Sequence, residues 1–120
     1  MPVPHAFVID DDDIVRNSLG RLLRVIGIPS SGFASAEAFL ERYRGDESGC
    51  LIVDIRMPGM SGIDLLEELQ GRGSTLPAIV ITGHTDEGSV QRLSGLNTVG
   101  LLEKPFSLAQ LREMLARCPA

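Results

Sequence analysis

Short apolar runs of strand length recur along the chain, and each is followed by a stretch in which apolar residues have helical spacing. The runs cover residues 6–9, 50–53, 78–81 and 98–102, with a weaker one at 32–34. Continuously apolar strands that alternate with helices are typical of a parallel sheet whose two faces are both covered. The sequence therefore predicts a small doubly wound α/β domain around a parallel sheet of five strands.

Glycines and polar caps mark the ends of the expected helices. Gly27 ends the first helix and Gly73 closes the third, while Ser35 is the expected N-cap of the second. Ser107 and Gln110 have the spacing of a capping box, which opens the last helix. The fourth helix, around residues 87–96, contains two glycines and a thin apolar face, so we expect it to be short or mobile.

Size and charge exclude several classes of protein. The 120 residues fit one domain, which we expect to span residues 1–120. A net charge of -5 and a pI near 4.9 argue against direct nucleic-acid binding, which needs clustered Lys and Arg. The apolar runs are far shorter than the roughly 20 residues of a membrane span. The start of the chain lacks the features of a secretory signal, so the expected location is the cytoplasm.

The two cysteines suggest no special chemistry. Cys50 and Cys118 do not have metal-ligand spacing and cannot supply a disulfide framework. Cys50 opens an apolar run and is expected to be buried as a small hydrophobic residue. We predict that both are reduced thiols with no part in the chemistry of the site.

Polar residues stand at the carboxyl ends of the expected strands, where doubly wound sheets bind ligands. Asp10 and Asp11 follow the first strand, Asp54 the third, Thr82 the fourth and Lys104 the fifth. Separate segments thus deliver three carboxylates, a hydroxyl and an ammonium group to one edge of the sheet. This convergence is the main indication of function.

Carboxylates gathered at one place repel one another unless a cation neutralises them. Mg²⁺ prefers oxygen ligands and keeps several waters, so one or two carboxylates and a carbonyl suffice to hold it. An ionised Asp54 beside such an ion can attack phosphorus and form an aspartyl phosphate. Lys104 would supply positive charge and Thr82 a hydroxyl donor to the phosphoryl oxygens.

Each residue also has a simpler interpretation. The acidic run Asp10–Asp13 can cap the first helix and favour its dipole. A single Asp or a Thr-Gly pair after a strand is a common turn, and a single Lys before Pro is usually solvated. Their joint occurrence at one edge of the sheet favours the phosphoryl site.

Four segments together resemble a known family. They read Val8-Ile9-Asp10-Asp11-Asp12, Val53-Asp54-Ile55-Arg56-Met57-Pro58-Gly59-Met60-Ser61-Gly62, Ile81-Thr82-Gly83-His84 and Glu103-Lys104-Pro105-Phe106. This pattern resembles the receiver domain of two-component response regulators. The third and fourth segments are most similar to the subfamily of the nitrogen-fixation transcription regulator.

The resemblance implies a CheY-like, flavodoxin-like fold with strand order 2-1-3-4-5 and phosphoryl transfer from a sensor histidine kinase to Asp54. It implies Mg²⁺ as the cofactor, with a cis peptide bond between Lys104 and Pro105. The implied metal ligands are Asp11, Asp54 and the main-chain carbonyl of Arg56, with Asp10 bound through water. Thr82 and Lys104 would contact the phosphoryl group.

Other positions in the pattern vary or depart from the family. Arg56 and His84 fall where the family tunes hydrolysis of its acyl phosphate, so we hypothesise that they set the lifetime of the signal. Leu101 stands where the family usually has the aromatic residue of its switch. Asn97 stands near a usual glycine and could still take the left-handed conformation that glycine adopts there. Both departures lie in the region that normally communicates phosphorylation.

The resemblance implies a signalling domain rather than a turnover enzyme. Its surface would change on phosphorylation and signal to an effector domain or partner protein, with homodimerisation as a family expectation. Relatives in the subfamily carry a C-terminal helix-turn-helix domain, whereas this chain ends one helix beyond Lys104. We therefore expect no direct DNA binding by this domain, and the sequence leaves open whether it stands alone or belongs to a longer regulator.

Two other functions compete with this interpretation. Asp11-Asp12-Asp13-Ile14-Val15 fits the D-x-D-x-V nucleophile motif of haloacid-dehalogenase phosphatases, but the later acidic pair is missing and Asp54 would have no role. The chain could instead be a receiver-fold docking module that is never phosphorylated. Failure to bind Mg²⁺ or to accept a phosphoryl group would favour that alternative.

Overall fold

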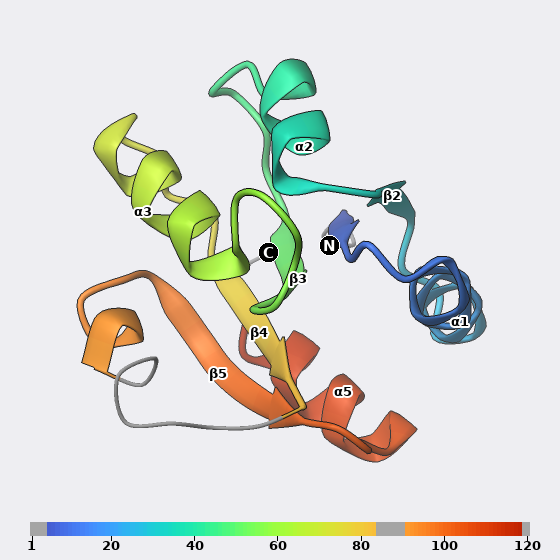
Figure 1. The fold of residues 1–120 in the computed structure, drawn as a ribbon. Helices are drawn as coiled ribbons and strands as arrows, with labels where there is room; N and C mark the ends of the chain where they lie inside the picture. Colours follow the sequence, from blue (N-terminus) through green and yellow to red (C-terminus); the bar gives the residue numbers. More distant parts are fainter. Residues whose placement is uncertain (1–4, 84–90, 119–120) are drawn as a thin grey trace.

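The computed structural model describes residues 5–83 and 91–118, which form a parallel sheet covered by helices (Figure 1). The five strands lie in the order β2-β1-β3-β4-β5, as the family resemblance implied. They are β1 (Ala6–Ile9), β2 (Ser30–Phe33), β3 (Cys50–Asp54), β4 (Ala78–Thr82) and β5 (Thr98–Glu103). Every pairing is parallel, so all the carboxyl ends lie at the same edge of the sheet.

Local capping signals position the helices. The described helices with complete bounds are α1 (Asp13–Val25), α2 (Ala36–Arg42), α3 (Gly62–Gly71) and α5 (Leu108–Ala116). Ser35 caps α2 by accepting a hydrogen bond from the Ala38 amide at 3.0 Å. The Ser107 and Gln110 capping box opens α5 with both of its hydrogen bonds formed, as the spacing predicted.

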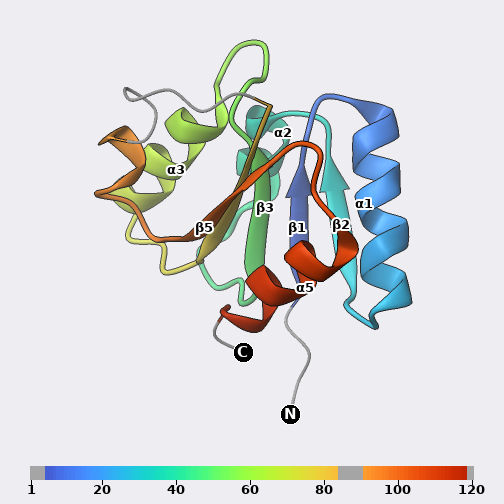
Figure 2. The same ribbon diagram turned by 90° about the horizontal axis from the view of Figure 1, so that it is seen from below.

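The two faces of the sheet support separate halves of the core. One half joins inward residues of the strands to Phe39 of α2 and to Leu65 and Leu69 of α3. In the other half, the alternate strand residues, which point to the opposite face of the sheet, pack with Leu19 and Leu23 of α1 and with apolar residues of α5. Figures 1 and 2 show the same division, with α2 and α3 on one face and α1 and α5 on the other. β3 and β4 are buried on both faces, which explains their uninterrupted apolar sequences.

Some sequence-based expectations need correction. The weak strand expected at residues 32–34 is β2, which begins at Ser30 and ends at Phe33. Its alternately exposed side chains fit an edge strand and gave a poor apolar signal. Asn97 is not left-handed, since no described residue other than glycine has a positive φ. Its side-chain amide instead donates to the Thr75 carbonyl oxygen at 2.9 Å.

Other expectations are confirmed or fall outside the described residues. The Lys104–Pro105 peptide bond is cis. Of the predicted fourth helix, residues 91–93 are helical, and residues 84–90 lie outside the described part of the chain. Within the described ranges, no helix has both the length and the apolar character that crossing a membrane requires.

Candidate functional site

The acidic run after β1 divides into a buried carboxylate and a helix cap. Asp10 is only 1% exposed, and its Oδ1 accepts a hydrogen bond from the Asp12 amide at 2.9 Å. Its Oδ2 is a buried oxygen without a hydrogen-bond partner. Asp12 caps α1 by accepting from the Ile14 amide at 2.9 Å, whereas Asp11 is exposed. The capping interpretation therefore holds for Asp12 and does not explain Asp10.

Burial makes Asp10 an unusual acid. Loss of hydration raises its pKa from the ordinary value of 3.8 to about 6, because the charged form is disfavoured away from water. The negative charges of Asp54 and Asp11 also raise the pKa of Asp10, while the Asp12 amide and Lys104 lower it. Four of the predicted site residues thus interact electrostatically. A positive charge beside Asp10 would relieve the unfavourable burial.

Asp54 ends β3 and is held at both carboxylate oxygens. It is 7% exposed, and its Oδ1 accepts a hydrogen bond from the Arg56 amide at 3.0 Å. Its Oδ2 accepts from Lys104 Nζ, also at 3.0 Å. Burial alone would lower the pKa of Lys104, but the hydrogen bond and the charges of neighbouring carboxylates raise it instead. Lys104 is therefore a stable positive charge beside the Asp54 carboxylate.

The ends of β4 and β5 bring Thr82 and Lys104 to the same edge. Thr82 is 1% exposed and ends β4, and its carbonyl oxygen accepts a hydrogen bond from the Lys104 amide at 2.8 Å. The cis bond to Pro105 follows directly. The structure thus brings together Thr82 at the end of β4, Asp54 at the end of β3 and Lys104 directly after β5.

Two residues that support the site were not identified from the sequence. Gly62 begins α3 against the main chain of Asp54, and a Cβ atom there would lie 2.3 Å from the Asp54 carbonyl oxygen. Arg16 of α1 donates from a guanidinium nitrogen to the Asp10 carbonyl oxygen at 2.7 Å and pairs with Asp13. Ser61 is the N-cap of α3, and the glycine that follows it is visible in the sequence, but its close approach to Asp54 depends on the packing of α3.

The donors fit a magnesium ion only if main-chain oxygen and water complete its ligand shell. Among the described residues, no three His, Cys, Asp or Glu side chains gather into a cluster that would hold a metal ion. The predicted set has two carboxylates as direct ligands, Asp11 and Asp54, together with the Arg56 carbonyl. The unpartnered Oδ2 of buried Asp10 is the feature that fits a nearby cation or its water.

Several other predicted residues lie away from this contact set. His84 is outside the described residues. Leu101 is partly buried and packs against the half of the core that includes α2 and α3. Cys50 is buried, as expected, but the contact between its Sγ and the Sγ of Cys118 was not predicted. Both lie in the half of the core that includes α1 and α5, not at the acidic edge.

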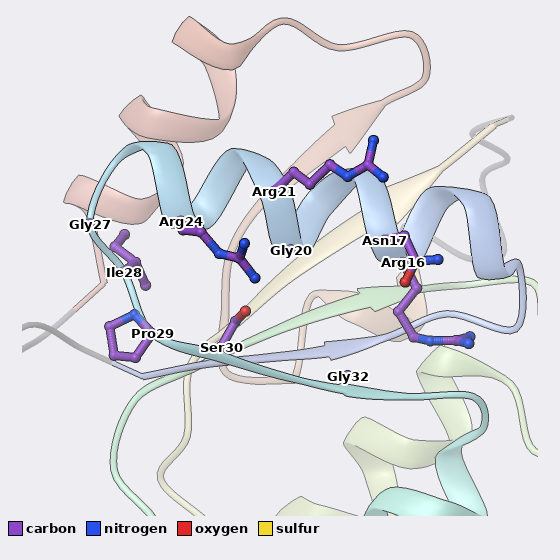
Figure 3. Close-up of a pocket in the computed structure, with 10 residues that line it drawn as sticks. All are labelled: Arg16, Asn17, Gly20, Arg21, Arg24, Gly27, Ile28, Pro29, Ser30 and Gly32. Atoms are coloured by element: carbon purple, nitrogen blue, oxygen red, sulfur yellow. The ribbon is translucent and has the colours of Figure 1, made fainter.

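A surface groove of about 830 Å³ lies between α1 and β2 (Figure 3). Arg16, Arg21 and Arg24 line it from the helix, and Ser30 and Gly32 line it from the edge strand. None of the predicted phosphoryl or metal residues lines this groove. The candidate chemistry therefore belongs to the acidic edge and not to this basic groove.

Comparisons with known proteins show which proteins this chain is similar to. The transcriptional regulatory protein FixJ of Azorhizobium caulinodans is 43% identical over 114 residues, which cover 92% of this chain and 54% of FixJ. The response regulator protein TodT of Pseudomonas putida is 37% identical over 105 residues, covering 88% of this chain and 46% of TodT. The chain thus spans about half the length of these relatives.

Solved structures give the same result. The crystal structure of FixJ-N has a TM-score of 0.89 and 36% identity, covering 98% of this chain and 94% of that one. The response regulator StyR has a TM-score of 0.90 and 38% identity, covering 98% of this chain and 59% of that one. Residues 6–116 match the family described as the response regulator receiver domain. The strand order, the acidic edge and these matches agree, and the chain belongs to the response regulator receiver domain family.

Proposed function

We propose that Asp54 accepts a phosphoryl group from a phosphohistidine of a sensor histidine kinase. The observation that carries the proposal is the buried Asp54 carboxylate, held by Lys104 at 3.0 Å, beside Asp10 with its unpartnered oxygen. A structural ion pair would need only Asp54 and Lys104. The additional buried carboxylate is costly for folding and is explained by binding of a cation and a phosphoryl group.

The chemistry requires little covalent participation from the protein. One oxygen of Asp54 attacks phosphorus, the phosphorus–nitrogen bond to the donor imidazole breaks, and the imidazole nitrogen keeps the electron pair and takes up a proton. The Lys104 ammonium group would then interact with the negative charge on the phosphoryl oxygens. The Thr82 hydroxyl would donate to one of these oxygens.

The proposed cofactor is Mg²⁺, held by Asp11, Asp54 and the main-chain carbonyl of Arg56, with Asp10 bound through water. When bound, the ion would neutralise negative charge on the phosphoryl oxygens and the carboxylates. The protein's own part is to hold Asp54 rigidly, through the Arg56 amide and the close packing of Gly62 against the Asp54 carbonyl. Rigid placement of the acceptor favours in-line attack on phosphorus.

We propose that phosphorylation changes the surface of the domain and signals to an effector domain or partner protein, in the cytoplasm. The chain would act as a signalling domain and not as a turnover enzyme, and homodimerisation on phosphorylation stays a prediction. FixJ, a relative, is named as a transcriptional regulatory protein and is about twice as long as this chain. The chain belongs to the receiver domain family, and the phosphatase alternative would leave Asp54 without a role.

Intact-mass spectrometry after incubation with acetyl phosphate and Mg²⁺ tests the proposal. The wild-type chain should gain the mass of one phosphoryl group, and the gain should be absent without Mg²⁺ and labile to hydroxylamine, as an acyl phosphate is. Asp54→Ala should show no gain. Asp46→Ala removes an exposed carboxylate away from the site and should react like wild type.

Two outcomes would overturn the proposal. A phosphoryl group that still attaches to Asp54→Ala would assign the acceptor to another residue. No gain in the wild type, with acetyl phosphate or with a phosphorylated histidine kinase domain, would favour the docking-module alternative.

Arg56 and His84 are proposed to set the lifetime of the aspartyl phosphate. Arg56 is exposed next to the acceptor, while His84 is outside the described residues. A double substitution of both residues should change the rate of dephosphorylation after removal of the donor. An unchanged rate would refute their role and leave the phosphoryl-transfer proposal intact.

A further inference from the structure

Two cysteines meet at the end of the molecule opposite to Asp54. Cys50 is the first residue of β3, and Cys118 lies two residues beyond the last residue of α5. Their Sγ atoms are 2.6 Å apart, although 68 positions separate them in the sequence. Figure 2 shows the reason: α5 runs back across the sheet and ends near the start of β3.

The pair is enclosed by the core that α1 and α5 share. Cys50 is 1% exposed and Cys118 is 8% exposed, and both pack with Leu111 and Leu115 of α5. Packing of α5 through these leucines fixes its final turn against the sheet. The two sulfur atoms are therefore held in contact by the fold and do not depend on a mobile segment to meet.

The surroundings make the two thiols chemically unequal. The hydrogen bond between the two thiols raises the pKa of Cys50, which is also more deeply buried, and lowers the pKa of Cys118. Cys118 is therefore the sulfur that more readily becomes a thiolate, and it is also the more exposed of the two. The thiolate is the form that reacts with oxidants.

We propose that Cys50 and Cys118 form a reversible intramolecular disulfide when the protein meets hydrogen peroxide or an alkyl hydroperoxide. The geometry carries the proposal: the sulfur atoms, 2.6 Å apart, are only about 0.6 Å beyond the length of an S–S bond. The inference does not depend on phosphorylation of Asp54, which lies at the other end of β3.

The reaction balances in two steps. The Cys118 sulfur attacks a peroxide oxygen, the O–O bond breaks, and the products are a sulfenic acid and water (or an alcohol). The Cys50 sulfur then attacks the sulfenic sulfur, an S–S bond forms, and the hydroxyl group leaves with the Cys50 proton as a second water. The two thiols lose two hydrogens and two electrons in total, and the peroxide is reduced. A dithiol reverses the link by thiol–disulfide exchange.

The link would tie the end of α5 to the start of the central strand. Cross-linking residues so distant in sequence restricts the unfolded chain strongly, so the melting temperature should rise by about 10 °C. It would also restrain α5, whose connection to β5 contains Lys104. The pair would therefore connect the redox state of the cell to the rigidity of this helix.

Peptide mapping of the peroxide-treated, 120-residue chain under non-reducing conditions tests the proposal. We expect a monomer lighter by two hydrogens, a linked pair of peptides containing Cys50 and Cys118, and no thiol that reacts with maleimide after denaturation. Dithiothreitol should restore both thiols. The melting temperature should rise on oxidation of the wild type, and Cys118→Ser should show neither the mass loss nor the rise.

Specific results would overturn the proposal. One is that both thiols stay reactive after a peroxide treatment that fully oxidises a free thiol peptide in the same tube. Others are oxidation of Cys118 to sulfinic acid with Cys50 still free, or a disulfide that only joins two chains. The mapping needs no substituted protein, so the proposal stays testable if Cys118→Ser folds poorly. Circular dichroism of that variant separates misfolding from loss of the link.

Discussion

Replacing Asp10 by asparagine should stabilise the metal-free protein at neutral pH. Asp10 is 1% exposed, and its Oδ2 has no hydrogen-bond partner. Asparagine keeps the size of the side chain and an oxygen that can accept from the Asp12 amide, which now donates to Oδ1 at 2.9 Å. It removes the buried negative charge, which Asp54 and Asp11 make still less favourable.

The pKa of Asp10 gives the magnitude. Burial raises it from 3.8 to about 6, a difference of about two units, and each unit corresponds to roughly 1.4 kcal/mol. The native state binds the Asp10 proton more tightly than the unfolded state, so its contribution to stability is complete below pH 3.8 and is lost as the pH rises through about 6. At pH 7.5 the free energy of unfolding of Asp10→Asn should therefore exceed that of the wild type by about 3 kcal/mol.

Urea unfolding in the presence of a chelator measures this difference. The midpoint should rise in Asp10→Asn with an unchanged m-value, because the area exposed on unfolding stays the same. The gain should shrink as the pH falls from 7.5 toward 4, where the wild-type Asp10 becomes protonated. Asp46→Asn, at an exposed position, is the matched control and should change stability by less than about 0.5 kcal/mol.

Two results would refute the reasoning. An Asp10→Asn protein that is no more stable than the wild type at pH 7.5 would mean that Asp10 is not a costly buried charge. A gain that is equal at pH 4 and pH 7.5 would assign the effect to something other than ionisation. Addition of Mg²⁺ extends the test, since the ion should stabilise the wild type more than Asp10→Asn if Asp10 helps to hold it.

Further substitutions test the support of the site. Lys104→Ala should lower the free energy of unfolding by less than about 1 kcal/mol, because solvent screens the 34% exposed Lys104 side chain. In an intact-mass time course, the same substitution should slow phosphoryl uptake by on the order of 100-fold. Uptake at the wild-type rate would contradict the role of Lys104. Gly62→Ala should lower stability by about 1–3 kcal/mol, since its Cβ would meet the Asp54 carbonyl. Gly71→Ala, in the same helix with open space around it, is the control and should not lose stability. Ser107→Ala should cost about 1 kcal/mol through loss of the α5 cap, and an unchanged urea midpoint would show that this cap is not needed.

The sequence alone was sufficient for features that depend on local chemistry or on the order of elements. The alternation of apolar runs and helices predicted the parallel sheet, and the parallel sheet predicted that Asp54, Thr82 and Lys104 share an edge. The Ser107 capping box was read correctly because all its hydrogen bonds join residues three apart. Local signals were weaker at β2, because an edge strand with exposed side chains lacks a continuous apolar run.

Only the tertiary structure distinguished residues that look alike in the sequence. Asp10 and Asp11 are adjacent acids, yet one is buried and the other exposed, because β1 ends between two neighbouring strands and the chain then turns outward toward α1. The contact between Cys50 and Cys118 follows from the packing of α5 on the sheet, which no spacing of cysteines reveals. Burial and long-range contacts are properties of the packed elements, so the charge state of Asp10 and the pairing of the thiols could not be derived from residue order.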